Sequence, residues 1–294
     1  MSQKELEKNR VQKSAGGPDS GIIPELKASA SSIVESRKLK IFGVDYTHFR
    51  TIDGGDLYVT KYGMGRLQFL WPENWYLEKW LFDKGERLEG TSAVRRITTK
   101  EVDGKSIDLV VKYSRVASKV RMGVGKGMES RIPESSVDYA NWNSPFEEFG
   151  LLMEMRSSPA SEGGFVVMSH RPMAIYCPPE KIELWQMERN EYRASMEDRT
   201  IRETQTGPEE SKVGLHADRQ YIMVYDWVKG DDAYTAFQKL GKTDDELKEF
   251  TLRVFDELRD KKGYRVLDHK PAHIIVKIKN NGCLLYTSDA ADEE

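Results

Sequence analysis

Apolar residues along the chain fall into separate runs, and the period of each run predicts one kind of element. Two β-rich runs, 94–99 and 107–112, flank an Asp-Gly pair at positions 103 and 104. Such a pair is a strong hairpin signal, because glycine adopts a positive φ without a Cβ clash. The pattern therefore predicts an antiparallel hairpin with its turn at Asp103 and Gly104.

Three segments have the spacing or composition of helices. Residues 145–156 form an amphipathic stretch that opens on a proline, and the charged residues 180–203 also favour a helix. Thr243 and Glu246 fit a capping box, in which the threonine caps the third backbone amide and the glutamate reaches back. Apolar residues then recur at helical spacing over 247–258. A helix is therefore predicted to begin near Thr243.

Other runs predict further strands and one segment without structure. Residues 165–176 and 221–228 are apolar and β-prone, and the aromatic-rich stretch 56–88 predicts a strand or two and a short helix. Residues 1–40 are instead rich in Lys, Glu, Ser and Gly and have few aromatics. That composition is typical of a disordered segment, so no core is expected there. The mixture of elements predicts an α+β fold.

Composition narrows the class of protein. The 294 residues are 38% hydrophobic and 32% charged, which is ordinary for a globular protein. The net charge of −3 leaves no overall excess to attract nucleic acid or an anionic membrane. No run approaches the roughly 18 apolar residues of a membrane span. The two cysteines, Cys177 and Cys283, form no disulfide framework, so a cytoplasmic location is expected.

The last twelve residues, 283–294, differ from the rest of the chain. They follow Gly282 abruptly, show no helical or strand period, and resemble translated sequencing adapter, namely the transposon-end oligonucleotide used in library preparation. The alternative is a natural acidic tail. The resemblance implies that the natural protein continues past Gly282 and that this chain is a fragment of it.

One loop carries the residues of a chemical site. Asp268-His-Lys-Pro-Ala-His-Ile-Ile-Val276 is a polar loop between an amphipathic helix and a short apolar strand. Its order resembles the catalytic loop of the protein-kinase superfamily. The resemblance implies that Asp268 accepts the substrate hydroxyl proton, Lys270 offsets phosphate charge, and His273 occupies a metal-binding position. The plain alternative is a Lys-Pro turn between a helix and a strand.

Two positions of this loop depart from the usual kinase pattern. His273 stands where Asn is usual, and Val266 stands where a His is usual. A His at the metal position resembles the lipopolysaccharide-kinase branch, among the atypical bacterial members of the superfamily, more than it resembles the Ser/Thr kinases. Imidazole ligates magnesium poorly compared with oxygen donors, so His273 could instead contact phosphate or be structural.

The order of elements upstream is similar to a kinase nucleotide site. Gly90, Thr91 and Ser92 precede the predicted hairpin in the place of a phosphate-covering loop, and Lys112 closes its second strand. The resemblance implies that Lys112 contacts phosphates while pairing with a glutamate of the next helix. Glu147, Glu148 and Glu154 all lie on that helix, and Glu148 is the predicted partner because apolar residues flank it on a core-facing stripe. A lysine at a strand end and a glutamate on a helix are, taken singly, commonly just solvated.

The strand at 221–228 completes the resemblance. Asp226 and Val228 stand at the positions of a hinge that would hold adenine through backbone groups, and Val94, Val110 and Ile275 could form apolar walls. Each of these apolar residues could equally be ordinary core.

The resemblance implies a kinase-like, two-lobed α+β fold with ATP and Mg²⁺ as cofactors. Its parts would be a disordered segment 1–40, an N-terminal-lobe-like sheet and helix with insertions over 41–228, the start of a truncated helical C-lobe over 229–282, and the adapter-derived tail 283–294. The expected activity is phosphoryl transfer from nucleotide to an unknown acceptor, with this chain an inactive fragment. The alternative is a catalytically silent scaffold that binds nucleotide or a partner.

Overall fold

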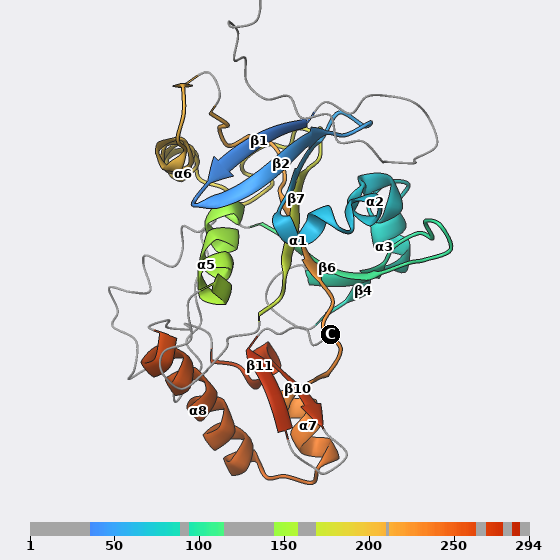
Figure 1. The fold of residues 1–294 in the computed structure, drawn as a ribbon, viewed down its shortest axis with the longest axis vertical. Helices are drawn as coiled ribbons and strands as arrows, with labels where there is room; N and C mark the ends of the chain where they lie inside the picture. The colour runs from blue at the N-terminus through green and yellow to red at the C-terminus, as the bar shows by residue number, and fades with distance from the viewer. Residues whose placement is uncertain are drawn as a thin grey trace, which may run out of the picture.

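The computed structural model describes residues 36–88, 94–114, 144–157, 169–209, 212–262, 269–278 and 284–288. They form an α+β fold built on an eight-stranded antiparallel sheet, with a second sheet of three strands (Figure 1). The large sheet has the order β1-β2-β3-β7-β8-β6-β5-β4. Its strands are β1 Ser36–Ile41, β2 Val44–Arg50, β3 Asp56–Val59, β4 Glu86–Arg87, β5 Val94–Thr98, β6 Asp108–Tyr113, β7 Pro172–Cys177 and β8 Ile222–Asp226.

Helices cover both faces of the large sheet. On one face, α5 and α6 pack over a core that includes Val110 and Tyr225. On the other face, α2 and α3 pack over a core that includes Trp75. The central strands β7 and β8 are buried along their whole lengths, as expected for strands covered on both sides. The helices of this part are α1 Lys61–Met64, α2 Leu67–Leu70, the 3₁₀ helix η1 Pro72–Asn74, α3 Trp80–Lys84, α5 Pro145–Ser157 and α6 Glu191–Thr204.

The hairpin predicted from the Asp-Gly pair is confirmed. Strands β5 and β6 pair antiparallel from Val94 opposite Lys112 to Thr98 opposite Asp108. Asp103 and Gly104 both have positive φ, 52° and 72°. Two consecutive residues of positive φ give the turn the twist that matches its strands, and only glycine adopts this conformation without strain.

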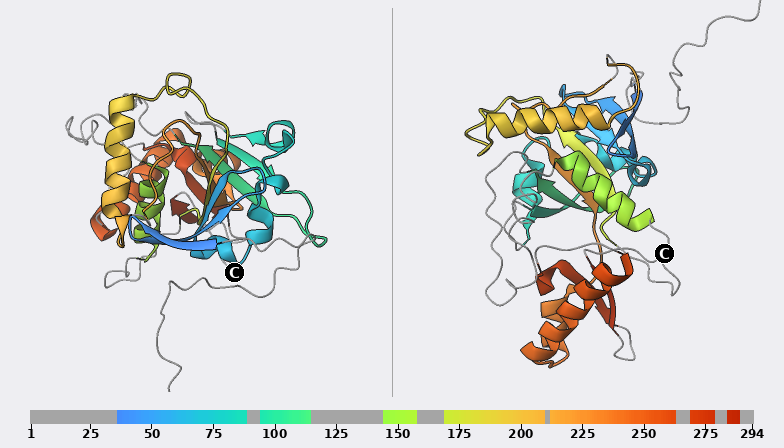
Figure 2. Two further views of the ribbon diagram at one scale, coloured as in Figure 1. Left: turned by 90° about the horizontal axis from the view of Figure 1, so that it is seen from above. Right: turned by 90° about the vertical axis from the view of Figure 1, so that its left-hand side faces the viewer.

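A smaller unit follows β8 and lies at one end of the molecule (Figure 2). Its helices α7 and α8 and strand β10 enclose a separate core that includes Phe250 and Ile274. The predicted capping box is confirmed, since Glu246 N donates to Thr243 Oγ1 at 3.3 Å and Thr243 N donates to Glu246 Oε2 at 2.9 Å. The elements of this unit are β9 Asp231–Asp232, α7 Ala233–Lys239, α8 Asp244–Lys262, the 3₁₀ helix η5 Pro271–His273, β10 Ile274–Ile278 and β11 Leu284–Ser288.

Two predicted boundaries are wrong. Disorder was expected to residue 40, but β1 begins at Ser36, with Leu39 and Ile41 buried and the lysines between and before them exposed. This alternation gives a short strand a buried face despite its polar composition. Residues 1–35 lie outside the described residues. Helix α6 begins at Glu191, not near 180, because the Asn190 side chain caps it by accepting from Arg193 N at 3.2 Å.

The tail was expected to have no regular structure, which is wrong for Leu284–Ser288. These residues form β11 and pair antiparallel with β10, from Ile274 opposite Ser288 to Ile278 opposite Leu284. Pairing at a sheet edge is made by main-chain groups and places few demands on side chains. A strand here is therefore compatible with either origin of the tail. Among the described residues, no helix is long and apolar enough to cross a membrane.

Candidate functional site

Lys112 and Glu148, 36 residues apart in the chain, form an ion pair between β6 and α5. The Lys112 ammonium donates to Glu148 Oε1 at 2.7 Å and to Oε2 at 2.9 Å. Tyr225 on β8 donates its hydroxyl to the same Oε1 at 2.6 Å. The helix glutamate predicted from the sequence is therefore the one that meets Lys112, and the carboxylate is fixed by donors from two neighbouring strands.

The position of Lys112 follows from strand geometry. Side chains two residues apart point to the same face of a strand, so Lys112 lies on the face that Val110 buries under α5. The Lys112 side chain is 32% exposed and the Glu148 side chain 26% exposed, so the pair lies at the margin of this core. A lysine ammonium has three donors, and Glu148 accepts from two of them. Among the described residues no other side chain pairs with this ammonium, so its third donor is available to an anionic group such as a phosphate.

Asp226 at the end of β8 is held by the protein itself. Its backbone N–H donates to the Arg171 carbonyl at 3.2 Å, and its carbonyl accepts from His170 Nδ1 at 3.0 Å. Its buried carboxylate forms an ion pair with Arg66. Asp226 was expected to present backbone groups to adenine, and here its N–H and its carbonyl each have a partner within the protein.

Val228, the other predicted hinge position, lies at the junction between the large sheet and the smaller unit. It is buried and packs against Ile275 of β10, so it joins the large sheet to the smaller unit. Val94 and Val110 belong to the core on the Lys112 face, with Val94 at its edge. The three apolar residues predicted to face adenine are thus divided between the sheet and the small unit, on either side of the segment that contains Val228.

The loop residues lie partly outside the described part of the chain. Asp268, and also Gly90, Thr91 and Ser92, are among the residues that the structure does not describe. Lys270 precedes η5, and its carbonyl accepts from His273 N at 3.0 Å. Within the described ranges, no three His, Cys, Asp or Glu side chains are grouped so that they could hold a metal ion.

Comparisons with protein-family models, with curated proteins and with solved structures gave no match to this chain. Arguments about its function therefore rest on the geometry of the sites themselves.

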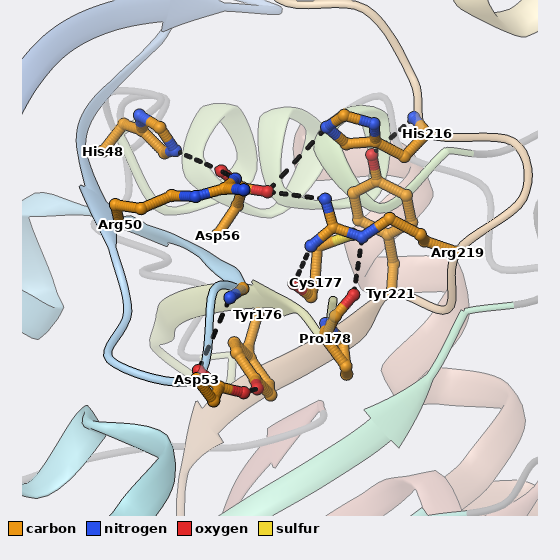
Figure 3. A network of polar contacts seen from close by, with 11 residues as sticks. His48, Arg50, Asp53, Asp56, Tyr176, Cys177, Pro178, His216, Arg219 and Tyr221 are labelled. Carbon is orange, nitrogen blue, oxygen red and sulfur yellow. Dashed lines mark hydrogen bonds and ion pairs between the residues drawn. The ribbon is translucent and has the colours of Figure 1, made fainter. Parts of the chain in front are cut away.

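A polar network around Asp56 was not predicted from the sequence (Figure 3). The Asp56 carboxylate accepts hydrogen bonds from His48 Nε2 at 2.9 Å, from Arg50 at 2.7 Å and from Arg219 at 2.7 Å, and His216 Nε2 lies 3.8 Å from it. Arg219 also donates to the carbonyls of residues 177 and 178. The network thus joins β2, β3 and the end of β7 to the segment before β8.

The donors decide the protonation state of Asp56. Burial alone would raise the pKa of this carboxyl, but the hydrogen bonds from His48, Arg50 and Arg219 outweigh it and hold the pKa well below its usual value. Burial and the nearby Arg219 lower the pKa of His216. No motif marks this network, because Asp56 and Arg219 are separated by 163 residues.

Two other buried groups have raised pKa values. Burial, with a contribution from the nearby Glu147 charge, raises the pKa of Glu197 on α6 to about 7, although a hydrogen bond from Ser144 opposes the rise. Burial raises the pKa of the Cys177 thiol to about 12. Cys177 is therefore a buried thiol of low reactivity, since the thiolate is the reactive form.

Proposed function

We propose that the chain belongs to an ATP-dependent phosphotransferase of kinase-like type, with an acceptor that neither the sequence nor the structure identifies. The observation that carries the proposal is the Lys112–Glu148 ion pair. A strand lysine held by a helix glutamate is the arrangement by which kinases position a lysine on nucleotide phosphates. Here the pair forms between the residues that the kinase resemblance selects, and the lysine keeps one donor for a further acceptor.

The residues divide into binding and transfer roles. Lys112 would hold the phosphates of ATP, and Val94, Val110 and Ile275 would contact the adenine ring. Bound ATP supplies the phosphoryl group, and Mg²⁺ would offset its charge. Asp268 would orient the acceptor hydroxyl and take its proton, and Lys270 would offset the charge that develops on the phosphoryl oxygens. His273 fits Mg²⁺ poorly because magnesium prefers oxygen ligands.

The test is nucleotide binding by the Lys112→Met variant. We expect the affinity for Mg-ATP to fall by about tenfold or more, because a charge-assisted hydrogen bond to phosphate is lost. Titration calorimetry measures the affinity directly. Lys100→Met is the matched control, since Lys100 forms a 2.7 Å ion pair with Glu78 and is 28% exposed, close to the 32% of Lys112. Equal affinities of the two variants, with melting temperatures showing that both are folded, would contradict the proposal.

A catalytically silent nucleotide-binding scaffold is the second candidate. Val266 and His273 favour it, because both stand where kinases carry catalytic or metal-binding side chains. In any form of the protein that transfers phosphate, an Asp268→Asn variant tests the catalytic role assigned to Asp268. For a phosphotransferase, transfer is abolished and nucleotide binding is retained. If wild-type protein binds Mg-ATP but transfers no phosphate to protein, sugar or lipid acceptors, the scaffold is favoured.

A further inference from the structure

We propose a second binding site, for a small oxyanion, in the cavity beside the Asp56 network. The cavity has a volume of about 270 Å³ and is lined by residues of β1, β2, β3, α6 and the segment 212–216. Strands β7 and β8 lie between β3 and the strand that carries Lys112. The site is therefore separate from the candidate nucleotide site and does not depend on its function.

Cationic side chains enter the cavity wall from three directions. Arg37 comes from β1, Arg202 from α6 and Lys212 from the segment that follows it, while His48 and His216 stand on either side of Asp56 (Figure 3). Residues so distant in the chain are brought together by the fold alone. Basic groups converging on one concave surface focus a positive potential there.

The carboxylates near the cavity do not cancel these charges. Asp56 is bonded to two arginines, Arg50 and Arg219, so its negative charge is more than balanced. The nearby Asp198 and Glu209 are the partners of Arg202 and Lys212. Arg37 adds a further positive charge. The region therefore carries a positive excess in a chain whose net charge is −3.

Arg37 is the residue best placed to bind a ligand. Its side chain is exposed on β1, and it forms no ion pair with any other residue in the described part of the chain. A guanidinium presents a planar set of donors that matches carboxylate or phosphate oxygens. The cationic groups opposite it are instead held in place by their carboxylate partners. A ligand would therefore bind between Arg37 and cationic groups whose positions are already fixed.

Gly214 lets the segment 212–216 pack closely against α6 at the cavity wall. A Cβ atom at this position would collide with the Arg202 guanidinium and would lie 2.6 Å from Asp198 Oδ1. The close approach lets Leu215 N donate to Asp198, which fixes the segment against the helix. Only glycine permits this approach without moving Arg202.

The size of the cavity limits the ligand. Pockets for drug-sized molecules are usually about 300–1,000 Å³, so this cavity suits a smaller molecule. Carboxylates and phosphates present the same oxygen acceptors to arginine and lysine. The proposed ligand is therefore a small molecule with a phosphate or carboxylate group.

Histidine ring resonances provide a direct test, because the chain has only five histidines. Inorganic phosphate is titrated into the full chain at constant ionic strength, with chloride as the control anion and succinate as the carboxylate probe. We expect saturable shifts of the His48 and His216 signals, assigned with His48→Gln and His216→Gln variants. Saturation by phosphate alone or by succinate alone identifies the anionic group that the site prefers. No saturable shift with either probe, or shifts confined to His170, His269 and His273, overturns the proposal.

Arg37→Gln tests the role of Arg37. We expect it to weaken phosphate or succinate binding about five- to tenfold, through the loss of a charge-assisted hydrogen bond. Lys38→Gln is the matched control, because Lys38 is the next residue of the same strand, is exposed and does not line the cavity. Equal affinities for the two variants would overturn the assignment. Lys212→Gln offers a second variant of the cavity wall should Arg37→Gln fail to fold.

Discussion

The Lys112–Glu148 pair and the Asp56 network use the same chemistry in different surroundings. Lys112 and Glu148 are 32% and 26% exposed, whereas Asp56 and Arg219 are 5% and 7% exposed. A partly exposed pair contributes little to stability but can exchange one contact for a ligand. A buried pair is costly to disturb, because removing one partner leaves an uncompensated charge in the interior. Burial therefore distinguishes a pair available for binding from one that holds the fold together.

The largest effect is expected from Asp56→Asn. This change leaves the buried Arg219 without its carboxylate, so the free energy of unfolding should fall by about 3 kcal/mol. Urea denaturation measures the change. Asp218→Asn is the control, because the Lys181–Asp218 pair is 79% and 45% exposed and its loss should cost under about 1 kcal/mol. A similar small loss in both variants would show that the buried network does not stabilise the fold.

A smaller effect of opposite sign is expected from Glu197→Gln. Glu197 is a buried carboxyl whose Oε1 has no hydrogen-bond partner among the described residues. Its pKa is raised from the usual 4.5 to about 7, because the folded protein favours the protonated, neutral form. The stability that this neutral carboxyl contributes is fully present below pH 4.5 and is lost as the pH rises to 7. At pH 8 the variant should be about 2 kcal/mol more stable than wild type.

Denaturation at several pH values tests this prediction. The advantage of the Glu197→Gln variant should appear as the pH rises from 4.5 to 7 and should be absent below that range. An advantage that does not change with pH would mean that side-chain size, and not ionisation, is responsible.

The smallest effect on stability is expected from Glu148→Gln. Because the Lys112–Glu148 pair is partly exposed, we expect a loss below about 1 kcal/mol. Mg-ATP affinity should nevertheless fall, since the glutamine no longer holds the ammonium in place. Denaturation and calorimetry on the same variant measure both quantities. Lower stability without a change in affinity would assign this pair to the fold, as for Asp56, and not to binding.

Sequence patterns identified features made by residues close in the chain. The hairpin turn at Asp103 and Gly104 and the cap at Thr243 depend on residues within one turn, so local chemistry specifies them. The apolar stripe of the helix indicated that Glu148 lies on the face toward the core, so Glu148 was selected as the partner of Lys112. Strand β1 was missed, since its few apolar residues lie among lysines and gain their core only through pairing with β2.

Distant contacts explain what the sequence did not show. The Asp56 donors come from residues 48, 50 and 219, and no spacing rule relates the last to the others. The bonding of Asp226 was also not predictable. Its partners Arg66 and His170 lie 160 and 56 residues before it in the chain. Such contacts are set by sheet order, which hydrophobic periodicity does not determine.

The shared carboxylate of Glu148 has a consequence for the motion of α5. Lys112 and Tyr225 reach it from adjacent strands, so the helix is tethered to the sheet at a three-centre junction. Contributions that share one acceptor are not independent, and removing both donors should cost a different free energy from the sum of the single losses. A phosphate that drew the ammonium away would leave α5 tied through the tyrosine. The helix could thus keep its register while the lysine changed partners.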